Sequence, residues 1–378
     1  MKIEQKTWSE SAGWNPGPLG DLKQEPQLVL VFGGNSALTV SRLEQIKSIY
    51  SKANIFGCST AGEISGTRVN DDTLVVTAVH FENVQVSGTK VKIRDDISSY
   101  DAGRNLANQI DKKGLRHVFV LSNGLKVNGS ELVKGLTDYL PENVSLTGGL
   151  SGDGPNFKHS QVIWDSMAES DSIAIMGFYG DRLKVGYGSK GGWDSFGPER
   201  VITKSNGNVL YELDGKSALD LYKQYLGEHA AGLPATGLLF PLSLRSDNGQ
   251  AGVVRTVLAI NEKDQSMTYA GDLPEGSYSR LMKANFDRLI DGAEGAARVC
   301  RNTLSSSQSE LAILISCVGR KMVLKQRIEE EVECVQEVLG HQTVLTGFYS
   351  YGEICPFDQG SRPELHNQTM TITALTEY

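Results

Sequence analysis

The chain has 378 residues, of which 39% are hydrophobic and 22% are charged, a composition typical of soluble globular proteins. Its formal net charge is −8, so a general affinity for nucleic acids or anionic membranes, which requires a basic surface, is not expected. No apolar stretch approaches the about 18 residues that a membrane-spanning helix needs, and the first residues lack the apolar centre of a secretory signal. We therefore expect a soluble, cytoplasmic protein.

Cysteine usage favours free thiols. The five cysteines are an odd number, and no two of them form a Cys-x-x-Cys pair. In a chain of this length, that pattern disfavours a disulfide framework. The cysteines are Cys58, Cys300, Cys317, Cys334 and Cys355.

One unit recurs three times along the chain: a strand, a helix, a second short strand and a glycine-rich loop that carries an acidic residue. In the first copy these elements are predicted at residues 28–35, 41–50 and 54–64. In the second copy they are predicted at residues 117–124, 129–140 and 144–154. In the third copy they are predicted at residues 311–320, 323–339 and 343–354. Strand–helix–strand units of this kind supply the parallel part of a sheet.

The pattern of apolar residues supports these assignments. The strands are short runs rich in Val, Ile and Leu, continuous rather than alternating, as in strands that are buried on both faces. In the second helix, Leu132, Leu136 and Leu140 share one face. Ser41 and Glu44 match a capping box and predict where the first helix begins.

The segments between the units alternate in polarity, which is typical of antiparallel strands. They are residues 73–81, 84–93, 171–177, 184–190, 252–261 and 369–375. Further helices are predicted at residues 101–110, 216–226 and 285–300. We therefore predict an α/β protein with mixed parallel and antiparallel sheets built around repeated βαβ units. A boundary near residue 215 divides it into an N-terminal domain, 1–215, and a C-terminal domain, 216–378.

Each glycine-rich loop follows the second strand of its unit, where open α/β sheets usually bind ligands. Glycine lets backbone N–H groups approach a guest closely, and pseudo-symmetric repeats can bring two such loops together around one cavity. Alternatively, the loops are tight turns whose acids cap neighbouring backbone groups. The candidate ligand-binding residues in these loops are Gly57, Cys58, Ser59, Gly62, Glu63, Gly152, Asp153, Tyr349, Tyr351, Gly352 and Glu353.

Single residues offer weaker signals. Cys58 and Ser59 are candidate nucleophiles, but neither stands in a local catalytic signature, so we favour a packing role for both. No two of the six histidines have metal-binding spacing, so a structural zinc site is not expected. A single imidazole can still be the axial ligand of a haem, because that role requires no local motif. His366, which follows the aromatic third loop, is the candidate.

Several longer motifs carry a resemblance to a known family. They are GCSTAGEI at 57–64, GGLSGDG at 148–154, VVRTVLAI at 253–260, AGDLPEGSYSRLM at 270–282, SCVGR at 316–320, GFYSYGEI at 347–354 and LHNQT at 365–369. With these motifs the chain resembles the FIST family of bacterial sensory proteins, in which an N-terminal and a C-terminal FIST domain stand in tandem. The resemblance runs from about residue 28 to the C-terminus.

The resemblance implies a ligand-sensing protein of signal transduction rather than an enzyme. A tandem chain without a kinase or methyl-accepting segment is similar to the NosP-type nitric oxide sensing proteins. Those proteins bind haem and regulate a partner histidine kinase or a cyclic-di-GMP enzyme. On this hypothesis haem is the cofactor, nitric oxide is the signal and His366 binds the haem iron.

Two other functions stay open. A sensor of an amino acid or another small metabolite, without haem, would bind an ammonium group through Glu63 and Glu353 and an anion through Arg255 or Arg320. Asn367, in the last motif, completes the candidate ligand-binding residues. An enzyme that uses the loop thiol or the loop acids is the third possibility, and it has no local catalytic signature to support it.

Overall fold

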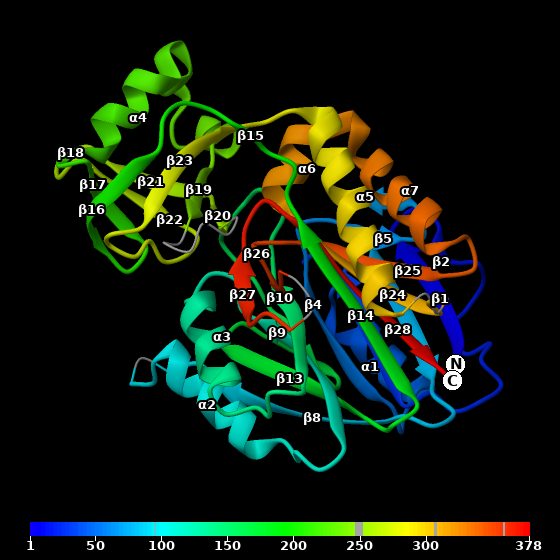
Figure 1. The fold of residues 1–378 in the computed structure, drawn as a ribbon. Helices are drawn as coiled ribbons and strands as arrows, with labels where there is room; N and C mark the ends of the chain where they lie inside the picture. Colours follow the sequence, from blue (N-terminus) through cyan, green and yellow to red (C-terminus); the bar gives the residue numbers. More distant parts are fainter. Residues whose placement is uncertain (95, 246–251, 306–307, 358–359) are drawn as a thin grey trace.

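Three of the sheets repeat one arrangement in the computed structural model, which describes residues 1–378 apart from 95, 246–251, 306–307 and 358–359 (Figure 1). In each sheet two parallel strands lie side by side in the middle. Antiparallel strands flank this pair on both sides. The predicted α/β class with mixed sheets around repeated βαβ units is therefore confirmed.

Strands that are far apart in the chain are neighbours in all three sheets. From one edge to the other, the first sheet contains β2 (Gly13–Asn15), β1 (Lys2–Ser9), β7 (Leu74–His80), β3 (Leu28–Gly33), β4 (Asn54–Ser59), β11 (Val162–Trp164) and β12 (Met167–Glu169). The second contains β8 (Gln85–Lys92), β13 (Ser172–Tyr179), β9 (Leu115–Ser122), β10 (Ser145–Leu150), β26 (Gly352–Pro356) and β27 (Pro363–His366). The third contains β14 (Leu183–Lys190), β28 (Met370–Glu377), β24 (Leu311–Cys317), β25 (Val344–Ser350), β5 (Glu63–Ser65) and β6 (Arg68–Asn70).

Each sheet is completed by a hairpin that belongs to another repeat. The hairpin β5–β6 follows the first loop but pairs with β25 of the third repeat. The hairpin β11–β12 follows the second loop but pairs with β4 of the first repeat. The hairpin β26–β27 follows the third loop but pairs with β10 of the second repeat. Because this exchange is cyclic, all three loops are drawn toward the place where the sheets meet.

One glycine in each repeat allows the parallel strands to approach each other closely. Gly57, Gly148 and Gly347 lie on β4, β10 and β25. A Cβ atom at these positions would lie 1.8, 1.9 and 1.9 Å from a carbonyl oxygen of the neighbouring parallel strand. The requirement for glycine at Gly57 therefore comes from strand packing, not from the approach of a ligand.

Helices cover the outer faces of the sheets. They are α1 (Val40–Ile49), α2 (Ser99–Gln109), α3 (Gly129–Thr137), α5 (Phe286–Thr303), α6 (Val318–Leu324) and α7 (Ile328–Leu339), with the 3-10 helix Lys325–Arg327 between the last two. Helix α2 packs against α3, and α5 packs against α7 (Figure 1). Leu132 and Leu136 of α3 are fully buried, as their spacing predicted. None of the helices in the described part of the chain is long and apolar enough to cross a bilayer.

Two details of the helices differ from the predictions made from sequence. The first helix is capped by Thr39, whose hydroxyl accepts the Arg42 N–H at 3.4 Å, and not by the predicted box that begins at Ser41. The helix predicted at 323–339 is interrupted at Lys325, which has a φ of 51°. Neither Gly nor Pro marks that break, so no local residue type predicts it.

A segment inserted before the third repeat forms a separate lobe, at the upper left of Figure 1. This insertion lobe, residues 194–283, lies between β14 and α5 and forms a nine-stranded antiparallel sheet with α4 against it. The elements are β15 (Asp194–Ser195), β16 (Arg200–Asn206), β17 (Val209–Leu213), β18 (Lys216–Ser217), α4 (Ala218–Leu226), the 3-10 helices Gly227–Gly232 and Ala235–Leu239, β19 (Leu242–Arg245), β20 (Val254–Arg255), β21 (Val257–Asn261), β22 (Ser266–Tyr269) and β23 (Tyr278–Lys283). The lobe has an apolar core of its own around Leu219, Phe240 and Met267.

Candidate functional site

The three glycine-rich loops meet where the sheets converge, and their backbones bond directly to one another. The Gly152 N–H of the second loop donates to the Ser59 carbonyl of the first at 2.9 Å. The Ala61 N–H of the first loop donates to the Tyr349 carbonyl of the third at 2.8 Å. The Tyr351 N–H of the third loop donates to a carbonyl at the end of β10 at 3.2 Å. All three loops therefore lie together and contact one another directly rather than a ligand held between them.

Glu63 and Glu353 are completely buried at equivalent positions of the first and third loops. Each accepts a hydrogen bond from the hydroxyl of the residue three positions before it. Each also accepts from a threonine directly before a flanking antiparallel strand, β7 or β28. The donors are the N–H and hydroxyl of Thr73 at 2.9 and 2.7 Å, and those of Thr369 at 3.2 and 3.0 Å. Burial raises the pKa of Glu63 to about 7 and that of Glu353 to about 8. Each carboxyl group therefore holds its own loop in place.

The remaining polar residues of the loops also bond within the protein. The Asp153 carboxylate accepts the Asn35 amide N–H at 2.6 Å and the His159 backbone N–H at 3.0 Å. The Ser59 hydroxyl donates to the Gly152 carbonyl at 2.7 Å. These contacts favour the alternative in which the loops are tight turns whose side chains satisfy neighbouring backbone groups.

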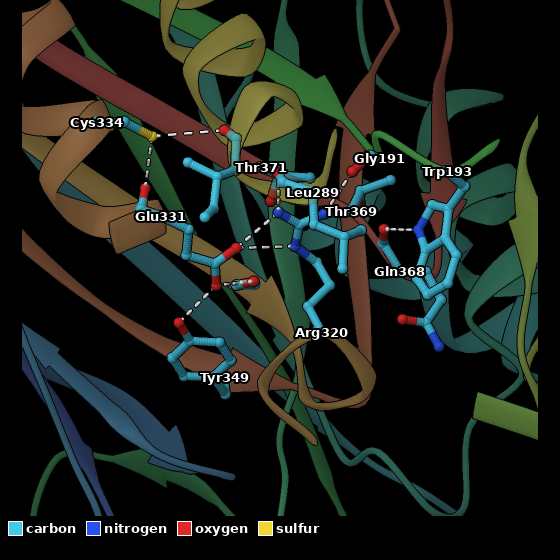
Figure 2. A network of polar contacts seen from close by, with 12 residues as sticks. Gly191, Trp193, Leu289, Arg320, Glu331, Cys334, Tyr349, Gln368, Thr369 and Thr371 are labelled. Atoms are coloured by element: carbon cyan, nitrogen blue, oxygen red, sulfur yellow. Dashed lines mark hydrogen bonds and ion pairs between the residues drawn. The ribbon is translucent and has the colours of Figure 1, made fainter. Parts of the chain in front are cut away.

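Arg320 is at the centre of a buried polar network (Figure 2). Its side chain is fully buried and forms an ion pair with Glu331 at 2.6 Å. The guanidinium also donates to the carbonyl oxygens of Gly191 at 2.5 Å and Leu289 at 2.7 Å. The other oxygen of Glu331 accepts the Tyr349 hydroxyl at 2.6 Å. Since these contacts join the third sheet, α5 and α7, Arg320 has a structural role.

A cavity of about 710 Å³ lies between the insertion lobe and the three-sheet core. Its walls are mostly apolar, and the Phe157 and Tyr351 rings stack on the core side with centroids 4.3 Å apart. Apolar side chains that are more than a third exposed lie along it: Leu125, Phe157, Leu258 and Met322. The insertion lobe contributes Leu233, Leu238, Val257 and Tyr269. Cavities of this size and polarity are typical of small-molecule sites.

Two buried polar side chains on the cavity wall have no partner among the described residues. Asn367 is 1% exposed, and neither its amide nitrogen nor its amide oxygen forms a hydrogen bond there. Thr256 is 5% exposed, and its hydroxyl also lacks a partner. Buried polar groups are nearly always hydrogen-bonded, so two such residues in the lining of one cavity mark it as a candidate binding site. Among the described residues that line the cavity, Lys126 alone carries a formal charge.

Arg255 connects the two segments that carry these residues across the lobe boundary. Its guanidinium donates to the Leu365 carbonyl of the core at 2.8 Å and to the Asp272 carbonyl of the insertion lobe at 3.1 Å. Thr256 follows Arg255 in the chain, and Asn367 follows Leu365 by two positions. Burial lowers the pKa of Arg255 to about 10, so the group stays a cation at neutral pH. Arg255 therefore ties the two lobes together and lies behind the cavity wall.

Comparison with protein families identifies the chain. The FIST N domain family matches residues 27–216, and the FIST C domain family matches residues 218–356. The chain belongs to the FIST family. FIST domains are generally sensory domains of signal transduction that bind small ligands, so the predicted membership of a sensory family is confirmed. The structure adds that exchanged hairpins join the two matched regions.

Relatives of this FIST protein give no further detail. An uncharacterized protein of Methanocaldococcus jannaschii is 24% identical over 332 residues, which cover 79% of this chain and 60% of that protein. Two solved structures of cyanuric acid hydrolase, one from A. caulinodans, are 8% identical and cover all of this chain and 98% and 99% of theirs, with TM-scores of 0.33 and 0.32. Scores this low support no inference about fold or activity.

The surroundings of His366 do not fit the axial haem ligand that its position after the third loop suggested. The His366 side chain is fully buried, its Nε2 lies 2.8 Å from the Cys355 carbonyl, and its ring packs edge-on against Phe357 with centroids 4.4 Å apart. Its Nδ1 has no partner among the described residues, but the ring is enclosed by protein and does not line the cavity. None of the other histidines in the described residues lines the cavity either. We therefore derive no step through a haem iron held by His366.

Of the residues predicted from sequence, Tyr351 and Asn367 line the cavity of this FIST protein. The loop acids and Arg320 are used inside the protein, so they do not form the expected amino-acid site. Cys58 is fully buried, and burial raises the pKa of its thiol well above its usual range, which removes the support for a nucleophile. Thr256 was missed although it stands beside Arg255 in the VVRTVLAI motif.

Proposed function

We propose that this protein senses a small molecule that binds in the cavity between the insertion lobe and the three-sheet core. The observation that carries the proposal is the pairing of an apolar cavity of about 710 Å³ with the unpartnered polar groups of Asn367 and Thr256. These two groups come from different lobes. A ligand that bonds to both of them joins the lobes, and membership of a family of sensory domains supports this use of the cavity.

The contacts between the lobes indicate how binding becomes a signal. Besides Arg255, Asn128 of the core donates to Asp272 of the insertion lobe at 2.9 Å. Gln368 of the core reaches the Leu238 carbonyl of the insertion lobe at 3.4 Å. A ligand that prefers one relative position of the lobes shifts the population toward it. A signalling partner that binds the surfaces of both lobes then distinguishes the two populations.

The proposal is tested by blocking the cavity. Ala235 is exposed and lines the cavity, whereas Ala231, in the preceding 3-10 helix, is exposed outside it. The probe is the uncharged, apolar fluorescent dye N-phenyl-1-naphthylamine. We expect the folded wild-type and Ala231→Trp proteins to bind it equally, and Ala235→Trp to bind it at least tenfold more weakly. If the dye does not bind the wild-type protein, or binds both tryptophan variants equally, the proposal is wrong.

The partners and the signal that the resemblance implied stay predictions. They are a histidine kinase or a cyclic-di-GMP enzyme as the partner, and nitric oxide with haem as the signal and cofactor. A haemin titration that gives a sharp absorption band, shifted by reduction and again by nitric oxide, would support the gas sensor. The absence of such a band would leave a sensor of an organic metabolite.

A further inference from the structure

The backbone on both sides of Asn367 is held by contacts within the protein. His366 pairs with Glu353 across the β26–β27 hairpin, and the Gln368 carbonyl accepts the Trp193 indole N–H at 2.9 Å. Gln368 has a φ of 61°, a left-handed conformation that is unfavourable for a residue other than glycine. Such strain persists where the surrounding structure fixes it, and it gathers at ligand sites. The backbone on both sides of Asn367 is therefore fixed by the protein itself.

The chemistry of the wall selects the ligand. An asparagine amide offers a donor beside an acceptor, so it pairs with a group that presents an acceptor beside a donor. A protonated amine would find no acidic side chain among the described residues of the lining, and it would share the cavity with Lys126. A carboxylate has no donor for the Asn367 oxygen, which would stay buried without a partner.

We propose that Asn367 and Thr256 form the recognition end of the cavity, and that the ligand is an uncharged, mostly apolar molecule whose head is a primary amide or a lactam. This inference rests on the proposed function and specifies its ligand class. The head bonds to both atoms of the Asn367 amide, the Thr256 hydroxyl adds a third bond, and the apolar body lies against the Phe157–Tyr351 stack.

The test uses four probes that share an indole ring and differ in the head: indole-3-acetamide, indole-3-acetate, its methyl ester, and tryptamine. Titration calorimetry on the full chain gives their affinities. We expect the amide to bind at least tenfold more tightly than the other three, because the ester and the carboxylate lack the donor and the amine lacks the acceptor. Equal affinities, or a protein that binds the dye but none of the four probes, overturn the inference.

Two variants separate recognition from a structural role. Asn367→Leu and Thr256→Val remove groups that have no partner among the described residues, so neither is expected to lower the melting temperature without ligand. Each variant should weaken the binding of indole-3-acetamide at least tenfold, whereas the dye should still bind. Asn108→Leu, at an exposed position of α2, is the matched control. Unchanged amide binding in Asn367→Leu overturns the inference even if the dye results uphold the proposed function.

Discussion

Glu63 and Glu353 are related by the internal repeat, and each is bound by the same kinds of donor: a nearby hydroxyl and both polar groups of a threonine. The second repeat has Gly154 at the matching distance from Gly148, so it lacks a third carboxyl of this kind. Instead, Asp153 of that loop bonds to Asn35. The acids thus fix the loops at the centre of the fold, and two of them are held there in unusual protonation states.

The first prediction is a loss of stability as the pH rises from about 6.5 to about 8. Burial raises the pKa of Glu63 to about 7 and that of Glu353 to about 8, whereas an unfolded glutamate titrates near 4.5. Between these values the folded chain keeps protons that the unfolded chain has lost, so the free energy of unfolding falls with pH. Stability from this source is complete below pH 4.5 and is lost through pH 7 and 8. We expect a decrease of about 2 kcal/mol over this window, measured by urea unfolding.

The pH window is chosen to isolate these two acids. His117 and His366 are buried, and burial lowers their pKa to about 3 and about 4, so they stabilise the fold as the pH rises, but only up to their ordinary value of 6.5. The control is Glu353→Gln, whose side chain is uncharged at every pH in the window and keeps an oxygen that can accept the Thr369 N–H and hydroxyl. This variant should show a flatter dependence and be more stable than wild type at pH 8. An unchanged slope would contradict the assignment.

The second prediction concerns the ion pair Arg320–Glu331. Arg320→Leu leaves the Glu331 carboxylate buried against Tyr349 without its cation, which should destabilise the protein by about 3–5 kcal/mol. The double variant Arg320→Leu, Glu331→Leu removes both charges. It should be more stable than Arg320→Leu alone, although the carbonyls of Gly191 and Leu289 still lose a donor. Urea unfolding of Arg320→Leu, Glu331→Leu and the double variant measures the coupling between the two residues. If the two single losses of stability add up to that of the double variant, the pair does not act as a unit.

The third prediction is that Arg255 couples the lobes. Arg255→Met keeps most of the buried volume but removes the bonds to Leu365 and Asp272. We expect Arg255→Met to exchange its amide hydrogens faster than wild type, with the largest increase around Leu365 and Asp272. Hydrogen exchange followed by mass spectrometry measures this difference. Arg280→Met, which removes a partly exposed arginine 3.9 Å from Glu199 within the same lobe, is the control. Equal exchange in the two variants would argue against a coupling role.

The repeats explain how much of this architecture could be predicted from sequence. Continuous apolar runs located the parallel pairs, and Leu132 and Leu136 occupy the buried face that their spacing indicated. The exchange of hairpins could not be predicted. The short strand Glu63–Ser65 pairs with β25, which is far away in the chain, and no residue pattern near the strand indicates this partner. The insertion lobe was missed for a similar reason: several of its strands contain only two to five residues.

The candidate site was harder to predict, because a polar residue in a loop can serve either a ligand or the backbone. Glu63 and Asn367 both stand in motifs that carry the family resemblance. Only the structure distinguishes them: the Glu63 carboxyl is surrounded by protein donors, and the Asn367 amide has no partner among the described residues. The cavity itself depends on how the insertion lobe packs on the core, which no local pattern encodes.

The last prediction is that His366 does not determine haem binding. Its Nε2 donates to the Cys355 carbonyl and its ring is enclosed, so iron could reach Nδ1 only if the β26–β27 hairpin opened. His366→Gln preserves a donor toward that carbonyl and should keep the fold, whereas it removes the imidazole. We expect wild type, His366→Gln and the control His229→Ala to give the same affinity and the same reduced spectrum in a haemin titration. A loss confined to His366→Gln would show that the hairpin opens to bind haem and would restore His366 as the axial ligand.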